Sequence, residues 1–446
     1  MLRGKRVAIT GLGTKNPLGN TVKESWENLK AGKSGIGPLT RFNPDDHRCG
    51  QDFPRIAGEV KEFDLTQLLR LEDLELVGLD ARFVRTATEF AEGMGIGKSE
   101  IRKMPLVLQY VIAAVIEALK DSQLNLSREK AWERGVAIGS GMGGGREFEI
   151  GVGALVKDGL KKIPPRTIIQ ILINMVSGEI ARYTGSEGPS DAVTSACATG
   201  AHNIARGAEY IRNGQAKIVI AGATEASIIP FGMGIFERIG ALSKGRLGPE
   251  RSSRPFDIQR DGFAIAEGAG ILILEEWNRA EKRGARIYGE VAGWASTSDA
   301  FHETEGNPLT QRRAMDQALK MAGLRLGDME RLYINAHATS TFKGDAIEAS
   351  AIKAFLGKWA EKGIVASRKG QLGHCLGAAA AIETIFALKE MEEGIILPNF
   401  NLEQADPACQ GLFLPVQRVN CKIEYFLKNA FGFGGQNSCL VVRQPT

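Results

Sequence analysis

"TSACATGAHNIARGAEYIRNGQAKIVIAGA" (residues 194–223) joins a helical pattern to a strand pattern. Apolar and small residues recur at helical spacing over 198–212, and the β-branched run "KIVIAGA" (217–223) follows. A helix that leads into a short, continuously apolar strand is typical of a parallel or mixed sheet covered by helices. This stretch therefore predicts an α/β fold.

The same alternation continues on both sides of this stretch. Further strands are predicted at 6–10, 270–276, 331–337 and 438–442, and further helices at 105–120, 312–322, 345–356 and 376–392. Glycine clusters follow several of these strands, at the place where α/β proteins build their sites. We expect the functional residues at these strand ends.

The length of 446 residues allows large cores and more than one structural unit. The charged stretch "EEWNRAEKRGARI" (275–287) is the best candidate boundary, and it divides the chain into 1–285 and 286–446. Both parts contain strand–helix alternation, which would allow a duplicated architecture. The segment 65–104 has many charges and poorly phased leucines, so it is predicted to be an insertion on the surface.

Composition excludes several classes of protein. A net charge of +4 favours neither nucleic acid nor a membrane surface as a partner, although a local basic patch could receive an acidic protein. The six cysteines include no CxxC pair, which argues against a zinc ribbon and a disulfide scaffold and favours a reducing, cytoplasmic location. The apolar run 107–119 is too short to span a membrane and predicts a core helix.

Two apparent motifs do not match what their chemistry needs. "GLGTKN" (11–16) follows a strand, but Asn16 stands where a dinucleotide-binding turn needs glycine. "HETEG" (302–306) lacks the second histidine of a helical zinc site. We therefore expect neither a nucleotide cofactor nor a metal.

Cys197 heads the predicted helix at 198–212 and lies among very small residues. It could be a buried structural thiol, half of a metal or disulfide site, or a nucleophile. A helix N-terminus offers a positive dipole end and free amides, which favour the thiolate. The small neighbours Ala196, Ala198 and Gly200 would let a substrate reach the sulfur.

Two histidines and a glycine turn favour the nucleophile. His337 in "NAHATST" (335–341) follows a strand, and His374 in "KGQLGHCLGAA" (369–379) stands just after a glycine. Each alone could be a hydrogen-bonded structural histidine, and "FGFGGQN" (431–437) alone could be a tight turn. Together, one thiol, two imidazoles and flexible amides suit thioester chemistry, with imidazoles that stabilise an enolate or its oxyanion.

At this point the chain resembles the β-ketoacyl-[acyl-carrier-protein] synthases of the second, FabF-like type. The motifs recur in the family's order, from "RVAITGLGTKNPLGNTVKESWENLKAGKSGI" near the start to "NAFGFGGQNSCLVV" at the end. "TSACATG", "NAHATST", "KGQLGH", "RPFDIQRDGFAIAEGAG" (254–270) and "STSDAFH" (296–302) lie between them. The resemblance implies a thiolase-like duplicated αβαβα five-layer sandwich, with the nucleophile in the first half and the histidines in the second.

The resemblance also implies a role for each matching residue. Cys197 would be the nucleophile, His337 and His374 would assist decarboxylation, and Lys369 would support the second histidine, with Glu383 as its polar partner. The amides of Cys197 and Phe433 would form the oxyanion hole. The remaining matches are Thr339 and Thr341 for the pantetheine arm, Met142, Phe236 and Phe433 for the acyl pocket, and Asp345 as a supporting residue.

The implied reaction is decarboxylative condensation of an acyl thioester, held on Cys197, with malonyl-acyl carrier protein. The implied partners are acyl carrier protein and a second copy of the chain, and the only cofactor is the phosphopantetheine that the carrier brings. Two alternatives stay open: a polyketide-type ketosynthase and a non-catalytic subunit that shapes chain length. The acyl chain and the identity of the carrier also stay open.

Four positions depart from the family pattern. Ala338 stands where glycine is usual, Phe342 where proline is common, Ala380 where glycine is usual, and Gln436 where threonine is common. Each larger or different side chain could crowd the thioester site or reshape the pantetheine tunnel. We therefore expect a specialised member with an altered acyl or carrier preference.

Overall fold

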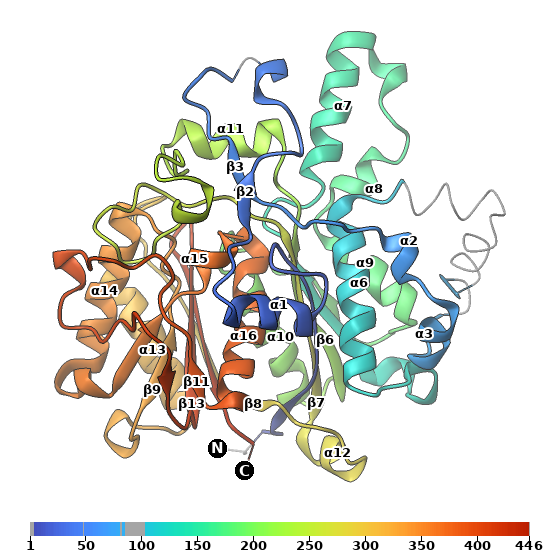
Figure 1. Ribbon diagram of the computed structural model, residues 1–446. Coiled ribbons are helices and arrows are strands. Elements are labelled where there is room, and N and C mark those ends of the chain that lie inside the picture. Colours follow the sequence, from blue (N-terminus) through green and yellow to red (C-terminus); the bar gives the residue numbers. More distant parts are fainter. Residues whose placement is uncertain (1–3, 48, 81–82, 85–102, 446) are drawn as a thin grey trace.

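Ten strands form one sheet at the centre of the molecule (Figure 1). The computed structural model describes residues 4–47, 49–80, 83–84 and 103–445. In sheet order, the strands are β10 (Gly363–Ala366), β9 (Leu332–Asn335), β13 (Tyr425–Gly432), β14 (Gln436–Arg443), β8 (Gly289–Ser298), β1 (Val7–Lys15), β7 (Gly268–Glu276), β6 (Ile218–Glu225), β4 (Arg134–Gly139) and β5 (Ser190–Asp191). Two small sheets pair β2 (Ile36–Pro38) with β3 (Ile56–Gly58) and β11 (Ile395–Ile396) with β12 (Val419–Asn420).

Helices separate and cover these strands. They are α1 (Val22–Lys30), α2 (Leu65–Leu68), α3 (Leu71–Leu76), α6 (Leu106–Asp121), α7 (Gly145–Asp158), α8 (Thr167–Ile171), α9 (Asn174–Thr184), α10 (Thr199–Arg212), α11 (Pro230–Arg238), α12 (Trp277–Lys282), α13 (Pro308–Met321), α14 (Phe342–Leu356), α15 (Lys369–Leu372) and α16 (Ala379–Glu393). The helices that the sequence predicts at 105–120, 198–212, 312–322, 345–356 and 376–392 are all present. They differ from the prediction by a few residues at their ends.

The same strand order occurs twice in the large sheet. From its middle outward, one side runs β1, β7, β6, β4, β5 and the other runs β8, β14, β13, β9, β10. In both sides the first three strands pair antiparallel and the outer pairs are parallel. The two sides meet where β1 pairs with β8 over Ala8 and Ile9 alone. The sheet is therefore built from two topologically equivalent halves.

Five layers result from this arrangement. The helices α10 and α16 lie between the two halves of the sheet and contact strands of both, as Figure 1 shows in its centre. α6 and α9 cover the outer face of the first half, and α13 and α14 cover that of the second. The predicted α/β, thiolase-like αβαβα sandwich is confirmed.

The strand predicted at 6–10 continues to Lys15, through Gly11 and Gly13. The reason is close packing against α6: a Cβ on Gly13 would lie 2.0 Å from the Ala114 carbonyl oxygen, and one on Gly11 would lie 2.2 Å from that of Ala118. The glycines that resemble a nucleotide-binding turn instead let a strand lie directly against a helix backbone.

The predicted surface insertion at 65–104 is described only in part. Its first residues form α2 and α3, which pack against α6 through buried Leu65 and Leu74. Residues 81–82 and 85–102 lie outside the described residues. Among the helices that are described, none combines the length and the apolarity needed to cross a bilayer.

Candidate active site

Cys197 lies between β5 and the start of α10, in the middle layer of the molecule. The preceding Ala196 has φ 48°, a left-handed conformation that turns the chain sharply before the cysteine. Gly432, at the end of β13, lies directly against this turn. A Cβ there would be 2.4 Å from the Ser195 carbonyl oxygen and 3.4 Å from the Cys197 amide nitrogen, so glycine lets the two segments touch.

Two histidines from the other half of the chain meet the thiol. Nε2 of His374 lies 3.0 Å from the Cys197 sulfur. The rings of His337 and His374 are 5.5 Å apart and nearly perpendicular. The sulfur and one ring nitrogen of each histidine lie within 4.8 Å of one another, a spacing that would also admit a metal ion. Residues that are far apart in the sequence thus form one compact group.

Burial keeps the side chain of Cys197 protonated. The side chain is 8% exposed, and burial raises the pKa of its thiol to about 12 even though the positive charge of Lys369 opposes the shift. The raised pKa is contrary to the prediction that the helix N-terminus favours the thiolate. α10 begins two residues later, at Thr199, and its dipole does not outweigh the loss of hydration.

Both histidines are neutral in this environment. Burial holds the pKa of His337 and that of His374 well below the usual range, and the positive charges of Lys369 and Lys428 lower both further. Within the described chain, Nδ1 of His374 has no hydrogen-bond partner. The pair therefore offers uncharged imidazoles at neutral pH.

A buried carboxylate holds two lysines behind the histidines. Lys369 donates to Oε1 of Glu383 at 2.6 Å, and Lys428 donates to Oε2 at 2.5 Å. All three side chains are at most 1% exposed. Burial raises the pKa of the Glu383 carboxyl, but the two lysines outweigh it and hold that pKa below its usual value. Lys369 contacts the predicted Glu383, and the structure gives no hydrogen bond from Lys369 to His374.

The loop from His337 to Thr341 is held by two carboxylates of α14. Glu348 accepts the amides of His337 at 2.9 Å and Ala338 at 2.6 Å. Asp345, fully buried, accepts the Ser340 amide at 3.1 Å and the Phe256 amide at 2.8 Å. Burial raises the pKa of Asp345 to about 7 against the attraction of its backbone donors. These contacts fix the backbone that carries the first histidine.

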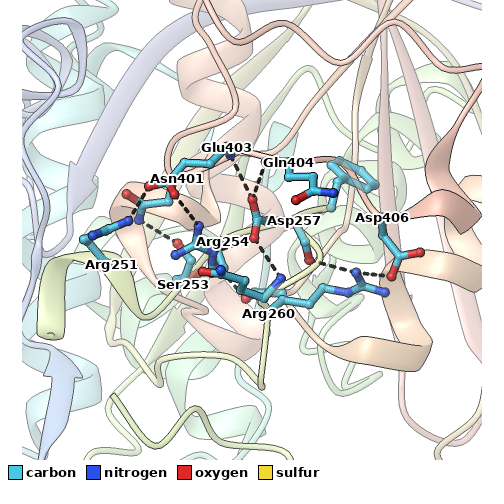
Figure 2. A network of polar contacts seen from close by, with 12 residues as sticks. Arg251, Ser253, Arg254, Asp257, Arg260, Asn401, Glu403, Gln404 and Asp406 are labelled. Carbon is cyan, nitrogen blue, oxygen red and sulfur yellow. Dashed lines mark hydrogen bonds and ion pairs between the residues drawn. The ribbon is translucent and has the colours of Figure 1, made fainter. Parts of the chain in front are cut away.

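A second network, drawn in Figure 2, braces the same loop from outside. Asp257 accepts Nε of Arg254 at 2.8 Å, and Arg260 bonds Asp406 at 2.7 Å. Arg260 also donates to the carbonyl oxygens of Thr341 at 2.9 Å and Phe342 at 2.6 Å. Residues 254–262 of this motif therefore support the loop, and Phe263, which follows them, lies with its ring 5.1 Å from that of His374.

The thiol opens into a cavity of about 440 Å³. Its lining includes both histidines, Phe236, Phe433, Thr339 and Thr341, and the two threonine hydroxyls lie 3.1 Å apart. Met142 lines a separate apolar cavity of about 490 Å³ with Phe231 and Ile173. Of the residues predicted to line the acyl pocket, Phe236 and Phe433 therefore share the cavity of Cys197, and Met142 does not.

The four departures lie in different surroundings. Ala338 and Phe342 line the cavity, and the ring of Phe342 is stacked by Arg260 at 5.2 Å. Lys343, beside Phe342, forms an ion pair with Glu305 across the cavity wall. Ala380 is buried in α16, and Gln436 is exposed at the start of β14. Only Ala338 and Phe342 can change the space that a thioester would enter.

Sequence reasoning missed Glu348, Lys428 and the buried Glu225. Glu225 accepts the amides of Gly141, Met142 and Gly377 and so joins the loop of Met142 to the segment that follows His374. One signal was available for Lys428, because a charge inside the apolar strand "YFLKNAF" (425–431) needs a buried partner. Nothing in the local sequence of the two glutamates distinguishes them from exposed helix or strand residues.

Comparison with known families agrees with this geometry. The model of the β-ketoacyl synthase N-terminal domain matches residues 4–280, and that of the C-terminal domain matches residues 288–403. The chain belongs to the β-ketoacyl synthase family. The resemblance seen in the sequence is confirmed.

Individual β-ketoacyl synthases match over nearly the whole chain. The 3-oxoacyl-[acyl-carrier-protein] synthase 2 of Vibrio harveyi is 37% identical and that of Coxiella burnetii 38%, covering 99% and 98% of this chain and equal shares of their own. Among solved structures, a ketosynthase in complex with its type II polyketide acyl-carrier protein is 31% identical, with a TM-score of 0.84 over 99% of this chain and 100% of that one. A β-ketoacyl synthase of Burkholderia phymatum is 28% identical, with a TM-score of 0.83 over the same shares.

Proposed function

We propose that the chain catalyses decarboxylative condensation of an acyl thioester with malonyl-acyl carrier protein, giving 3-oxoacyl-acyl carrier protein in fatty-acid or related acyl-chain synthesis. The observation that carries the proposal is the group formed by Cys197, His337 and His374, with Nε2 of His374 at 3.0 Å from the sulfur. The relatives named 3-oxoacyl-[acyl-carrier-protein] synthase 2 support the same activity.

In the first half-reaction the acyl group moves to Cys197. The sulfur attacks the carbonyl carbon of the acyl thioester, a new carbon–sulfur bond forms, and the bond to the pantetheine sulfur breaks. The thiol proton ends on the departing pantetheine sulfur. The amides of Cys197 and Phe433 would receive the negative oxygen of the tetrahedral intermediate, and the contact at Gly432 keeps these amides together.

In the second half-reaction malonyl thioester loses CO2. The electron pair of the breaking carbon–carbon bond forms an enolate, whose carbon attacks the acyl carbonyl on Cys197 and expels the cysteine thiolate, which takes up one proton from solvent. The enolate oxygen needs hydrogen-bond donors. A His374 tautomer with its proton on Nε2 leaves only a lone pair unpaired at Nδ1, so it is the favoured and donating form.

Acyl carrier protein is the proposed partner, and its phosphopantetheine enters as part of the substrate. The hydroxyls of Thr339 and Thr341 in the cavity wall suit the amides of a pantetheine arm. The ketosynthase solved with its acyl-carrier protein supports this partnership. Since the nucleophile is a thiol and all six cysteines are free, a reducing, cytoplasmic location suits the enzyme.

A homodimer is also proposed. The first half of the chain exposes large apolar side chains on α7 and α8, among them Val156 at 81% and Ile168 at 59%. Figure 1 shows α7 projecting from the body of the molecule. Exposed apolar side chains on two neighbouring helices favour a protein partner, and a second copy would cover them on both chains.

A polyketide-type ketosynthase is the second candidate, favoured by the polyketide ketosynthase that matches at 31% identity. The curated synthase 2 relatives are more similar, at 36–38% identity over at least 98% of the chain. A non-catalytic chain-length subunit is disfavoured, because Cys197 and both histidines form one group. Turnover of saturated acyl chains against polyketide intermediates separates the first two candidates.

The test of the proposal is acyl transfer followed by intact-protein mass spectrometry. With acyl-carrier thioester, the wild-type protein and the Cys49→Ser control should gain one acyl mass, and Cys197→Ser should gain none on a thiol. Malonyl-carrier protein should release CO2 far more slowly with His337→Ala or His374→Ala. A chelator should leave both steps unchanged. Acylation of Cys197→Ser at another cysteine would contradict the assignment.

A further inference from the structure

Lys428 is a fully buried charge in the middle of β13. Its ammonium donates to three acceptors: Glu383 at 2.5 Å, the Asn335 side chain at 2.9 Å and the Ala336 carbonyl at 3.3 Å. Burying an ammonium is costly even when it is paired. Neither the reaction described above nor the resemblance assigns this lysine a role.

The contacts of Lys428 end beside the first histidine. Asn335 is the last residue of β9, and Ala336 and His337 follow it directly. Lys428 therefore ties the strand end that carries His337 to the carboxylate that also holds Lys369. On the far side, the amides of His337 and Ala338 are held by Glu348. The position of the imidazole depends on both anchors.

The lysine also decides the sign of the charge behind the imidazoles. Glu383 gives one carboxylate oxygen to each lysine, so the group of Lys369, Lys428 and Glu383 has a net charge of +1. Without Lys428 the group would be neutral. Of the charged groups that face the ammonium, Glu383 on α16 and Glu348 on α14 attract it and Lys369 on α15 repels it.

This positive charge acts on both histidines. Lys428 lowers the pKa of His337 and that of His374, in the same direction as burial. An imidazolium would form an ion pair with the malonyl carboxylate and so stabilise the ground state that must lose CO2. Neutral imidazoles can still donate a hydrogen bond to the enolate oxygen. A positive charge behind the pair therefore favours decarboxylation over tight binding of the malonyl group.

We infer that Lys428 is a positioning residue of the condensation reaction, which anchors the strand end of His337 and keeps both imidazoles uncharged. The role in condensation rests on the proposed function, but the anchoring of His337 and the effect of the charge on the imidazoles can be tested without a substrate. It predicts that charge, and not only a hydrogen-bond donor, is required at position 428. Burial lowers the pKa of this ammonium to about 8, so the lysine is charged at neutral pH.

Two variants separate charge from hydrogen bonding. Lys428→Gln keeps a donor toward Glu383 without the charge, and Lys428→Arg keeps the charge. The control is Lys422→Gln, because the Lys422 side chain is 72% exposed and pairs with the nearby Glu424. Release of CO2 from malonyl-carrier protein is measured from pH 5 to 9. The acid limb of Lys428→Gln, which is the fall of its rate toward low pH, should lie about one pH unit higher than that of the wild type.

A second measurement requires no carrier protein. The rate of Cys197 alkylation by iodoacetamide should fall several-fold at pH 7 in Lys428→Gln, because Glu383 is then less compensated and opposes the thiolate. If Lys428→Gln alkylates slowly but no variant releases CO2, the proposed function fails and the role of the charge stands. If Lys428→Gln keeps the wild-type acid limb and alkylation rate, the inference is overturned.

Folding is checked for each variant by its melting temperature. Should Lys428→Gln not fold, Lys428→Arg and the wild-type protein decide the question. Lys428→Arg should keep the wild-type acid limb even if its rate falls through poorer fit. If the acid limb of Lys428→Arg shifts by the one pH unit expected for loss of the charge, the inference is overturned.

Discussion

Cys197 is kept protonated by the same burial that shelters the reaction from water. Its pKa of about 12 lies far above neutral pH, so a small alkylating agent should find few thiolates at neutral pH. In the proposed reaction, the amides near Gly432 would donate hydrogen bonds to the carbonyl oxygen of the acyl thioester and stabilise the charge that forms as the sulfur attacks. Selectivity for thioesters over other electrophiles follows from this arrangement.

Glu348→Gln should weaken the site through the backbone of His337. The carboxylate accepts the amides of His337 and Ala338, and an amide side chain would turn a donor toward one of them. We expect a loss of about 1–3 kcal/mol in the free energy of unfolding and at least a tenfold slower release of CO2. The exposed Glu361→Gln is the matched control. Full activity in Glu348→Gln would show that the loop does not need this anchor.

Asp345 should make stability fall as pH rises. Its pKa is about 7 in the folded chain against 3.8 for an ordinary Asp, so its contribution is complete below about pH 4 and is lost as pH rises through 7. Asp345→Asn cannot titrate. Urea unfolding should show a free-energy advantage of the wild type over Asp345→Asn that is larger at pH 5 than at pH 7. The exposed Asp158→Asn should show no such change, and a constant difference for Asp345→Asn would contradict the prediction.

At the scale of residues, motifs predicted the three side chains that the structure brings together better than the residues that hold them in place. Cys197, His337 and His374 each stand among small residues at the end of an element, which is a local signal. Glu348 and Glu225 act through contacts with backbone amides outside their own helix or strand, and no local pattern encodes such contacts. The raised pKa of Cys197 was missed for the same reason, since burial is a property of the assembled layers.

At the scale of elements, glycine in β1 lets the strand lie against α6. The sequence predicted the strand only to residue 10, because glycines break an apolar run and resemble a turn. Glycine is needed because a Cβ at position 13 would lie 2.0 Å from the Ala114 carbonyl oxygen, and this closeness depends on how the layers pack. Helices were predicted more closely, since their periodicity is contained in one stretch of sequence.

Gly13→Ala and Gly153→Ala should have opposite effects. The first places a methyl group against backbone, which cannot move cheaply, and we expect a loss of about 3 kcal/mol or more. Gly153 lies within α7 with open space at its Cβ, so alanine there should stabilise by about 0.5–1 kcal/mol. Thermal unfolding of both variants checks this. Equal melting temperatures would contradict the packing argument.

At the scale of the whole molecule, the repeated strand order supports the boundary predicted at 285/286. We propose that residues 1–285 and 286–446 are two structural halves, joined through α12. Strand–helix alternation in both parts was visible in the sequence. The register of the junction was not, because only the pairing of β1 with β8 over Ala8 and Ile9 defines it.

The proposed homodimer predicts how a charge on α7 should act. Val156→Asp places a carboxylate on the apolar surface of α7 and should shift sedimentation from dimer to monomer. Val416→Asp is the matched control, because Val416 is also exposed, at 61%, but lies outside α7 and α8. An unchanged dimer in Val156→Asp would exclude this surface as the interface, and a wild-type monomer would exclude the dimer itself.

The thiol comes from one half of the chain and both imidazoles from the other. A ribosome that has made only the first half has produced a cysteine without its histidines, its lysines or the turn at Gly432. Reactivity toward thioesters therefore appears only after the last strand, β14, has closed against β8. We therefore expect truncated chains that lack β14 to show no activity toward thioesters, and only the fully synthesised chain to be active.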